Sequence, residues 1–146
     1  MKFTCTIEIE QTLEKVAQLF ADPKYLGNYQ PGFISKEIIK GSSGQNGAIS
    51  KMYYKQGKGK MELTETIVDN NLPHSFFATY HHKHMDNTMK CSFTALSTTR
   101  TRYTSEIEYT AFRGVLPKLM AFLVPGLFKK QVQKWLNNFK LFAENQ

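Results

Sequence analysis

Hydrophobic and polar positions divide the chain into a long region with a repeat of two and a C-terminal region with a repeat of three or four. At the start, Phe3, Cys5, Ile7 and Ile9 alternate with polar residues, which predicts a half-buried strand. Turn residues separate further extended segments, which are 33–40, 48–55, 61–69, 75–82, 88–96 and 101–112. Because the links between them are short, consecutive strands must run antiparallel.

Two short helices are predicted between the first and second strands. Thr12 can cap a helix that ends at Asp22 and Pro23, since proline interrupts helical hydrogen bonding. Tyr25 and Leu26 indicate a second short helix before the glycine and proline turns that precede residue 33.

The C-terminal region predicts a long helix with one apolar side. The residues of that side recur in steps of three and four, and they are Phe128, Val132, Trp135, Leu136, Phe139, Phe142 and Ala143. A second apolar stripe over 116–127 points elsewhere, and Pro125 and Gly126 stand at the change, so we expect a short helix over 116–124 and then a break. The uncharged segment 119–128 is shorter than the roughly 20 residues that span a bilayer. It is interpreted either as a helix packed in the core or as a lid or membrane-touching flap.

Together these elements predict an α+β protein: a curved antiparallel sheet of seven strands that grips the long C-terminal helix, with two short helices between strands 1 and 2. A length of 146 residues predicts one domain over 1–146. The N-terminus lacks an apolar signal region, which indicates a cytoplasmic protein. Cys5 and Cys91 both fall at apolar positions, so we expect two reduced, buried thiols.

The formal net charge of +7 favours anionic partners such as phospholipid head groups, acidic metabolites or nucleic acid. The lysines are mostly dispersed, however, and a solvated surface is the favoured explanation for them. We therefore expect no nucleic-acid partner, while a peripheral membrane contact stays open.

The order of elements resembles the helix-grip fold of the START-like, or SRPBCC, superfamily, in particular its polyketide cyclase/dehydrase and lipid-transport branch. The stretches that carry the resemblance are 16–32, which ends in Tyr29-Gln30-Pro31-Gly32, 99–109, which opens with Thr99-Arg100-Thr101-Arg102-Tyr103, and 114–130. The resemblance implies a deep cavity between sheet and final helix that holds sterols, lipids, hormones or polyketides, and it implies that only some members are enzymes. It also implies that the first and sixth strands flank the last one. Cys5 and Cys91 would then lie about 9 to 10 Å apart, beyond the reach of a disulfide.

The inward positions of the strands and the inner side of the helix supply candidate ligand contacts. They are Tyr80, His82, Phe93, Tyr103, Ser105, Tyr109, Phe128, Val132 and Trp135. The same alternation also places Ala95 inward. Several hydroxyls and one imidazole among apolar side chains suit a ligand with a polar end. The alternative is an ordinary core in which each tyrosine hydroxyl reaches the rim or a backbone partner.

Candidate chemistry is limited to acid and base groups. His81, His82 and His84, with Asp86 nearby, suggest a metal site, but zinc needs three or four convergent ligands and no further one is evident, so no metal or cofactor is predicted. Glu65 shares its strand phase with apolar neighbours and would be buried unless a bulge turns it outward. No nucleophile and base occur at a recognisable spacing, and the glycine-rich stretches lack the order of a phosphate-binding loop.

The sequence therefore predicts binding of a hydrophobic or amphipathic small molecule, lipid- or polyketide-like, in a cavity between the sheet and the C-terminal helix. Segment 119–128 would control access to that cavity. One alternative is an enzyme of the cyclase/dehydratase type that uses His82, Glu65 or a tyrosine for proton transfer. Another is a membrane-peripheral interaction module. The pattern favours a binding role over an enzymatic one and assigns no catalytic residue.

Overall fold

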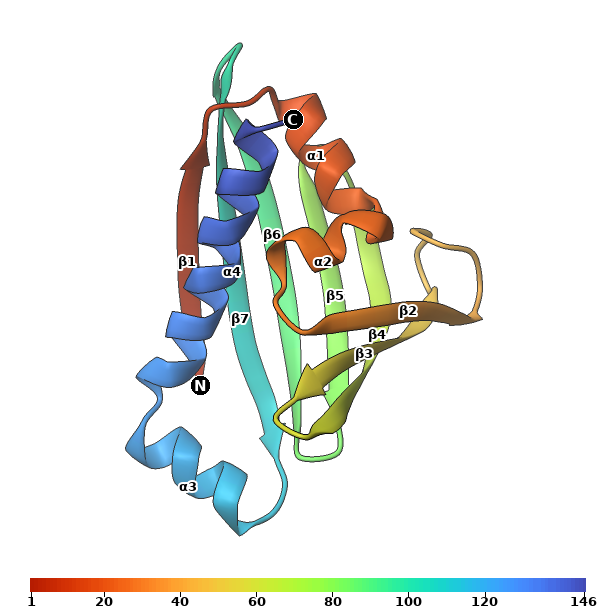
Figure 1. The fold of residues 1–146 in the computed structure, drawn as a ribbon, viewed down its shortest axis with the longest axis vertical. Helices are drawn as coiled ribbons and strands as arrows, with labels where there is room; N and C mark the ends of the chain where they lie inside the picture. Colours follow the sequence, from red (N-terminus) through yellow and green to blue (C-terminus); the bar gives the residue numbers. More distant parts are fainter.

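A curved antiparallel sheet wraps around a long C-terminal helix in the computed structural model, which describes residues 1–146 (Figure 1). The strands are β1 (Lys2–Ile9), β2 (Phe33–Lys40), β3 (Ile49–Gln56), β4 (Gly59–Asn71), β5 (Ser75–His82), β6 (Met85–Ser97) and β7 (Arg100–Phe112). The helices are α1 (Leu13–Ala21), the 3-10 turn η1 (Pro23–Tyr25), α2 (Leu26–Tyr29), α3 (Val115–Leu123) and α4 (Gly126–Glu144). The seven strands lie in the order β1-β7-β6-β5-β4-β3-β2, which confirms the predicted fold class.

The two cysteines lie two strands apart, as the resemblance implied. Cys5 on β1 and Cys91 on β6 both stand opposite Ser105 of β7, on its two sides. Both thiols are buried and free. The sheet order therefore explains why the two cysteines do not form a disulfide.

Local hydrogen bonds begin and end the helices where the sequence predicted. The Thr12 hydroxyl accepts a hydrogen bond from the Lys15 amide at 3.2 Å, which caps α1. Asp22 ends this helix and accepts from the Lys24 amide at 3.0 Å. Between α3 and α4 the chain turns at Val124 and Pro125, because proline has no amide hydrogen with which to continue the first helix.

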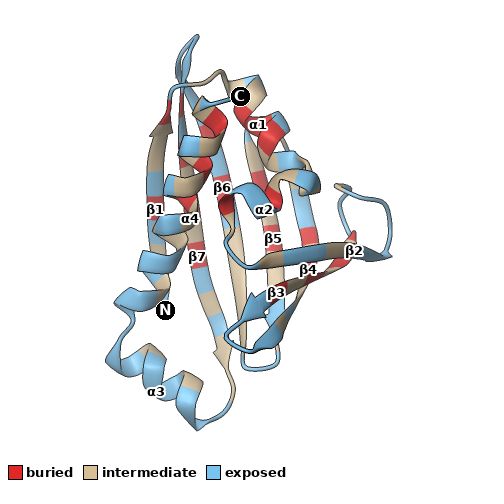
Figure 2. Ribbon diagram, viewed as in Figure 1, coloured by how far each residue is buried: buried red, intermediate tan, exposed pale blue.

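The helices pack on the sheet at one end of the molecule. There α1, α2 and the C-terminal half of α4 cover the concave face of the sheet, and many of the buried residues gather beneath them (Figure 2). Phe139 is the centre of this core and meets the rings of Phe20, Tyr29 and Tyr103 edge-on at centroid distances of 6.5, 4.9 and 5.7 Å. Met52 and Tyr54 of β3 are also buried, beside the cavity. Toward α3, the other half of α4 is largely exposed or half-buried.

Three details differ from the sequence predictions. Segment 119–128 is not part of the core: no residue of α3 is buried, because this helix lies beyond the end of the sheet where no element covers it (Figure 1). The strand expected to begin at residue 88 begins at Met85, so the turn after β5 is confined to Lys83 and His84, and Asp86 lies in β6 opposite His81. Ala95 is exposed, because the register of β6 and β7 shifts between Ala95 and Ser97.

Candidate ligand-binding site

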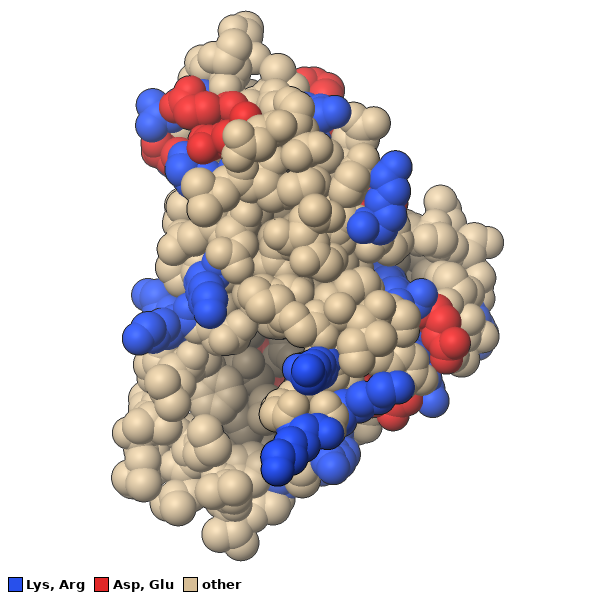
Figure 3. Space-filling view, in the orientation of Figure 1, with Lys and Arg blue, Asp and Glu red and all other residues tan.

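A cavity of about 570 Å³ lies between the concave face of the sheet and α4. Residues of the α1–α2 region, of β2 to β7 and of α4 form its wall, and 21 of the 34 lining residues are hydrophobic. In the space-filling view the cavity opens as a hollow between the start of α4 and the hairpin of β3 and β4 (Figure 3). The wall is therefore mainly apolar, and the site communicates with solvent at the end opposite the core.

Aromatic side chains form the wall on the helix side. Trp135 of α4 stacks on Tyr54 of β3 with a centroid distance of 6.1 Å and an interplanar angle of 10°. The indole Nε1 of Trp135 is buried and has no hydrogen-bond partner. Val132 and Phe128, about one and two turns earlier on α4, line the cavity nearer its mouth.

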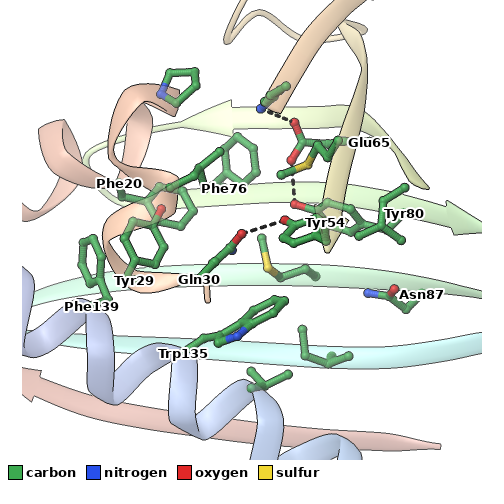
Figure 4. Close-up of a pocket in the computed structure, with 18 of the residues that line it drawn as sticks. Phe20, Tyr29, Gln30, Tyr54, Glu65, Phe76, Tyr80, Asn87, Trp135 and Phe139 are labelled. Carbon is green, nitrogen blue, oxygen red and sulfur yellow. Dashed lines mark hydrogen bonds and ion pairs between the residues drawn. The ribbon is translucent and has the colours of Figure 1, made fainter. Parts of the chain in front are cut away.

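A buried carboxylate with two partners forms a polar cluster in this apolar wall (Figure 4). The Tyr80 hydroxyl donates to Glu65 Oε2 at 2.7 Å, and Lys36 Nζ donates to Glu65 Oε1 at 2.7 Å. Pairing of β4 with β5 places Glu65 directly opposite Tyr80, so both side chains point to the concave face. Strand β2 brings Lys36 to the same point. The cluster combines a negative acceptor, a positive donor and a hydroxyl.

A second polar pair lies closer to α2. The Tyr54 hydroxyl donates to Gln30 Oε1 at 2.6 Å (Figure 4). Burial raises the pKa of Tyr54, and burial together with the Glu65 charge raises the pKa of Tyr80 well above the usual tyrosine value. Both hydroxyls are therefore protonated at neutral pH, and each can serve as a hydrogen-bond donor.

His82 stands at the boundary between the cavity and the exterior. Its Nδ1 accepts a hydrogen bond from the His84 amide at 3.2 Å, so the proton of the neutral ring lies on Nε2. Burial, followed by the positive charge of neighbouring residues, lowers the pKa of His82. His81 faces the outside and contacts Asp86 at 2.6 Å. No three His, Cys, Asp or Glu side chains come together in a way that could hold a metal ion.

Seven of the nine predicted contacts line the cavity, namely Tyr80, His82, Tyr103, Tyr109, Phe128, Val132 and Trp135. Phe93 and Ser105 do not line it. Phe93 packs in the solid core against Phe20 and Tyr103 at 5.1 and 4.8 Å, and Ser105 is buried beside Cys91. Strand alternation identifies the inner face of a strand, but it does not reveal where along that face the helix stands away from the sheet.

The sequence reasoning missed Gln30, Lys36 and Tyr54 as cavity residues, and it considered Glu65 only as a possible acid or base. Tyr54 could have been found, because it falls in the apolar phase of β3. Lys36 had no such signal. Strand β2 pairs irregularly with β3, with register shifts on both sides of Lys36, and a lysine in an extended segment is usually exposed.

An outer groove of about 660 Å³ adjoins the mouth of the cavity. Gln56, His82, Met85 and Phe128 border both spaces. Leu116, Pro117 and Met120 of α3 form one wall of the groove, and the facing ends of β4 and β5 supply mainly polar and charged residues. Helix α3 therefore lines the approach to the cavity.

No protein-family model and no curated protein matches the chain. Solved structures do. A conserved protein from Geobacillus kaustophilus matches at a TM-score of 0.81 and 16% identity, over 99% of this chain and 96% of its own. The Zhui aromatase/cyclase from Streptomyces sp. R1128 matches at a TM-score of 0.80 and 11% identity, over 99% of this chain and 93% of its own. A START superfamily protein from Mycobacterium smegmatis matches at a TM-score of 0.75 and 11% identity, over 95% of this chain and 96% of its own.

These similarities establish the fold. The chain has the helix-grip fold of START-like, or SRPBCC, proteins, as the sequence resemblance indicated. Structures with this fold include the aromatase/cyclase above and norcoclaurine synthase from Thalictrum flavum in complex with dopamine and hydroxybenzaldehyde. No helix of the structure is both long and apolar enough to cross a membrane.

Proposed function

We propose that the chain binds an amphipathic small molecule, lipid- or polyketide-like, in the cavity between the sheet and α4. The observation that carries this proposal is the combination of a mainly apolar space of about 570 Å³ with one buried polar cluster on its wall. Ligand sites of known proteins have this size and this distribution of a few polar groups among many apolar ones.

The apolar part of the ligand would supply most of the affinity. Each Å² of apolar surface removed from water contributes about 25 cal/mol, so the large apolar wall favours an extended or fused-ring molecule. The polar end would lie at Glu65, where a ligand hydroxyl can donate to the carboxylate. A ligand carbonyl can instead accept from Lys36, whose ammonium has three donors and uses one for Glu65.

Binding can be tested with a fluorescent apolar probe and with native mass spectrometry of the purified protein. Val132→Trp fills part of the cavity from α4 and should weaken probe binding at least about tenfold, or 1.4 kcal/mol. Val68 is exposed on β4 and does not line the cavity, so Val68→Trp is the matched control and should leave probe binding unchanged. Equal probe affinity in the two variants would overturn the proposal.

A second candidate function is catalysis of the cyclase/dehydratase type on such a ligand. It is favoured by the Tyr80 and Glu65 pair, because the Tyr80 hydroxyl donates a hydrogen bond to the Glu65 carboxylate on the cavity wall. The pair therefore offers a substrate both a proton donor and a proton acceptor. His82, neutral and half-buried at the mouth, could accept a proton from a bound substrate. The similar Streptomyces protein is an aromatase/cyclase, which supports the same possibility.

Catalysis requires its own experiment. A linear poly-β-ketone analogue would be incubated with the protein, and ring closure or loss of water would be followed by mass spectrometry. Tyr80→Phe, Glu65→Gln and His82→Ala should each slow turnover about a hundredfold or more if the group transfers a proton. Probe binding by the same variants separates lost chemistry from lost binding. Absence of turnover, or turnover unchanged in all three variants, would leave the binding function alone.

A further inference from the structure

Helix α3 carries a continuous apolar surface that no part of the chain covers. Phe122 is 82% exposed and Leu123 is 62% exposed. Further exposed apolar residues on this helix and the turn after it are Val115, Leu116, Leu119, Met120, Val124 and Leu127. A monomeric protein rarely leaves so many large apolar side chains together in water, and such a surface usually marks an interaction site.

The chain segment that carries this surface has charges of one sign only, and Glu62 of β4 is the one acidic residue on the groove that α3 lines. From residue 110 to residue 143 the chain has six basic side chains and no acidic one. Lys118, Lys129 and Lys130, which flank the apolar surface, are exposed and form no ion pair, since the ion-paired lysines are Lys2, Lys24, Lys36, Lys51 and Lys140.

The β3–β4 hairpin across the mouth adds further exposed lysines. They are Lys55, Lys58 and Lys60, and they too are unpaired. Figure 3 shows basic side chains on both sides of the hollow, with the uncharged surface of the α3 region beside it. Apolar groups and a cationic rim therefore lie on the same side of the molecule as the opening of the cavity.

We propose that α3 docks this protein on the surface of an anionic phospholipid bilayer. Phe122 and Leu123 would enter the boundary between head groups and acyl chains, and the surrounding lysines would contact lipid phosphates and carboxylates. A helix of nine residues is too short to span the bilayer, so it lies in the interface. A second copy of this chain fits the surface less well, because docking two such faces brings two cationic rims together.

Docking in this way places the cavity mouth against the bilayer. Helix α3 lines the outer groove, and Phe128 borders both the groove and the cavity. An apolar ligand could then move between membrane and cavity with little exposure to water. This last consequence rests on the proposed ligand-binding function, whereas the docking itself does not.

Co-sedimentation with vesicles tests the docking directly. The protein should bind vesicles of phosphatidylcholine mixed with phosphatidylserine and bind pure phosphatidylcholine vesicles more weakly. The double variant Phe122→Ser/Leu123→Ser should lose at least about tenfold in affinity, since two large side chains no longer bury apolar area. Lys129→Gln should lose about fivefold. Leu141→Ser is the matched control, because Leu141 is also 62% exposed but lies near the end of α4.

Insertion of α3 can be separated from simple charge attraction. Both native thiols are buried, so Leu123→Cys introduces the one accessible thiol, to which an environment-sensitive fluorophore can be attached. Its emission should rise on anionic vesicles, whereas the same label at Leu141→Cys should not respond. Because no side chain of α3 is buried, these variants should keep the urea midpoint of the parent protein.

Two results would overturn the inference. One is vesicle binding that the Phe122→Ser/Leu123→Ser variant retains, with no emission change at position 123. The other is a dimer in analytical ultracentrifugation that this variant dissociates, in the absence of vesicle binding. Probe binding in the cavity is measured without vesicles, so a failure of docking leaves the test of ligand binding unaffected.

Discussion

The ion pair between Lys36 and Glu65 gives a quantitative prediction about the polar cluster. The two charged atoms lie 2.7 Å apart, and the side chains are 18% and 5% exposed. Lys36→Met removes the cation and leaves the buried carboxylate with Tyr80 as its remaining side-chain partner. Removing one partner of a buried pair costs about 3 to 5 kcal/mol. We expect a loss of about 3 kcal/mol in the free energy of unfolding, at the low end of that range, because Glu65 lies on the cavity wall and keeps some contact with water.

The second variant in this experiment removes both charges. Lys36→Met/Glu65→Gln keeps an acceptor for the Tyr80 hydroxyl and leaves no buried charge, so it should lie within about 1 kcal/mol of the parent protein. Glu65→Gln alone should cost about 1 kcal/mol, because the Lys36 ammonium can turn toward water. The cycle therefore predicts a coupling energy of about 3 kcal/mol between the two side chains.

Urea unfolding followed by the fluorescence of Trp135 measures these differences, and thermal unfolding should show Lys36→Met melting roughly 6 to 12 °C lower. The exposed pair Lys51 and Glu62, at 3.2 Å with side chains 40% and 50% exposed, provides the control. Lys51→Met should cost less than about 1 kcal/mol. The reasoning is refuted if Lys36→Met is no more damaging than Lys51→Met, or if the double variant is as unstable as Lys36→Met.

Three further predictions concern the core, one surface carboxylate and the thiols. Phe139→Ala should lower the free energy of unfolding by about 4 kcal/mol in urea, and a loss below about 1 kcal/mol would contradict its central place in the core. Hydrogen bonds from Arg113, with a smaller effect of His81, lower the pKa of Asp86 to about 2, so the stability it contributes is complete above pH 3.8 and disappears as the pH falls toward 2. Arg113→Gln should return that pKa toward 3.8 in an NMR titration, and an unchanged value would exclude Arg113 as the cause. Burial raises the pKa of Cys5, and raises that of Cys91 to about 11. Both thiols should therefore resist Ellman's reagent at neutral pH until urea is added. Reaction of the folded protein would show that they are accessible.

The sequence was sufficient for the fold because its signals are local and repeated. Alternation with a period of two predicted all seven strands, Thr12 predicted the cap of α1, and Pro125 with Gly126 predicted the break before α4. Short turns then left the antiparallel meander as the sole arrangement of β2 to β7. The pairing of β1 with β7 came from the family resemblance, since nothing within β1 identifies its partner.

The cavity was less accessible to sequence reasoning, because it depends on distances between elements. Phe93 and Tyr103 share a strand phase and face each other across β6 and β7, but only Tyr103 also reaches the cavity. Glu65 was foreseen as inward-facing, yet its partner Lys36 lies 29 residues away on the irregular strand β2. The exposure of α3 was equally hidden, since an apolar stripe looks the same on a core helix and on an uncovered one.

The tightly packed core closes the inner end of the cavity, so Phe139 belongs both to the core and to the cavity wall. Residues nearer the mouth, such as Phe128 and Val132, shape what the cavity can hold but are only half-buried. Substitutions around the mouth can accumulate without threatening the folded state. Such a layout allows descendants of one ancestral scaffold to change their guest molecule in few mutational steps while inheriting the same backbone.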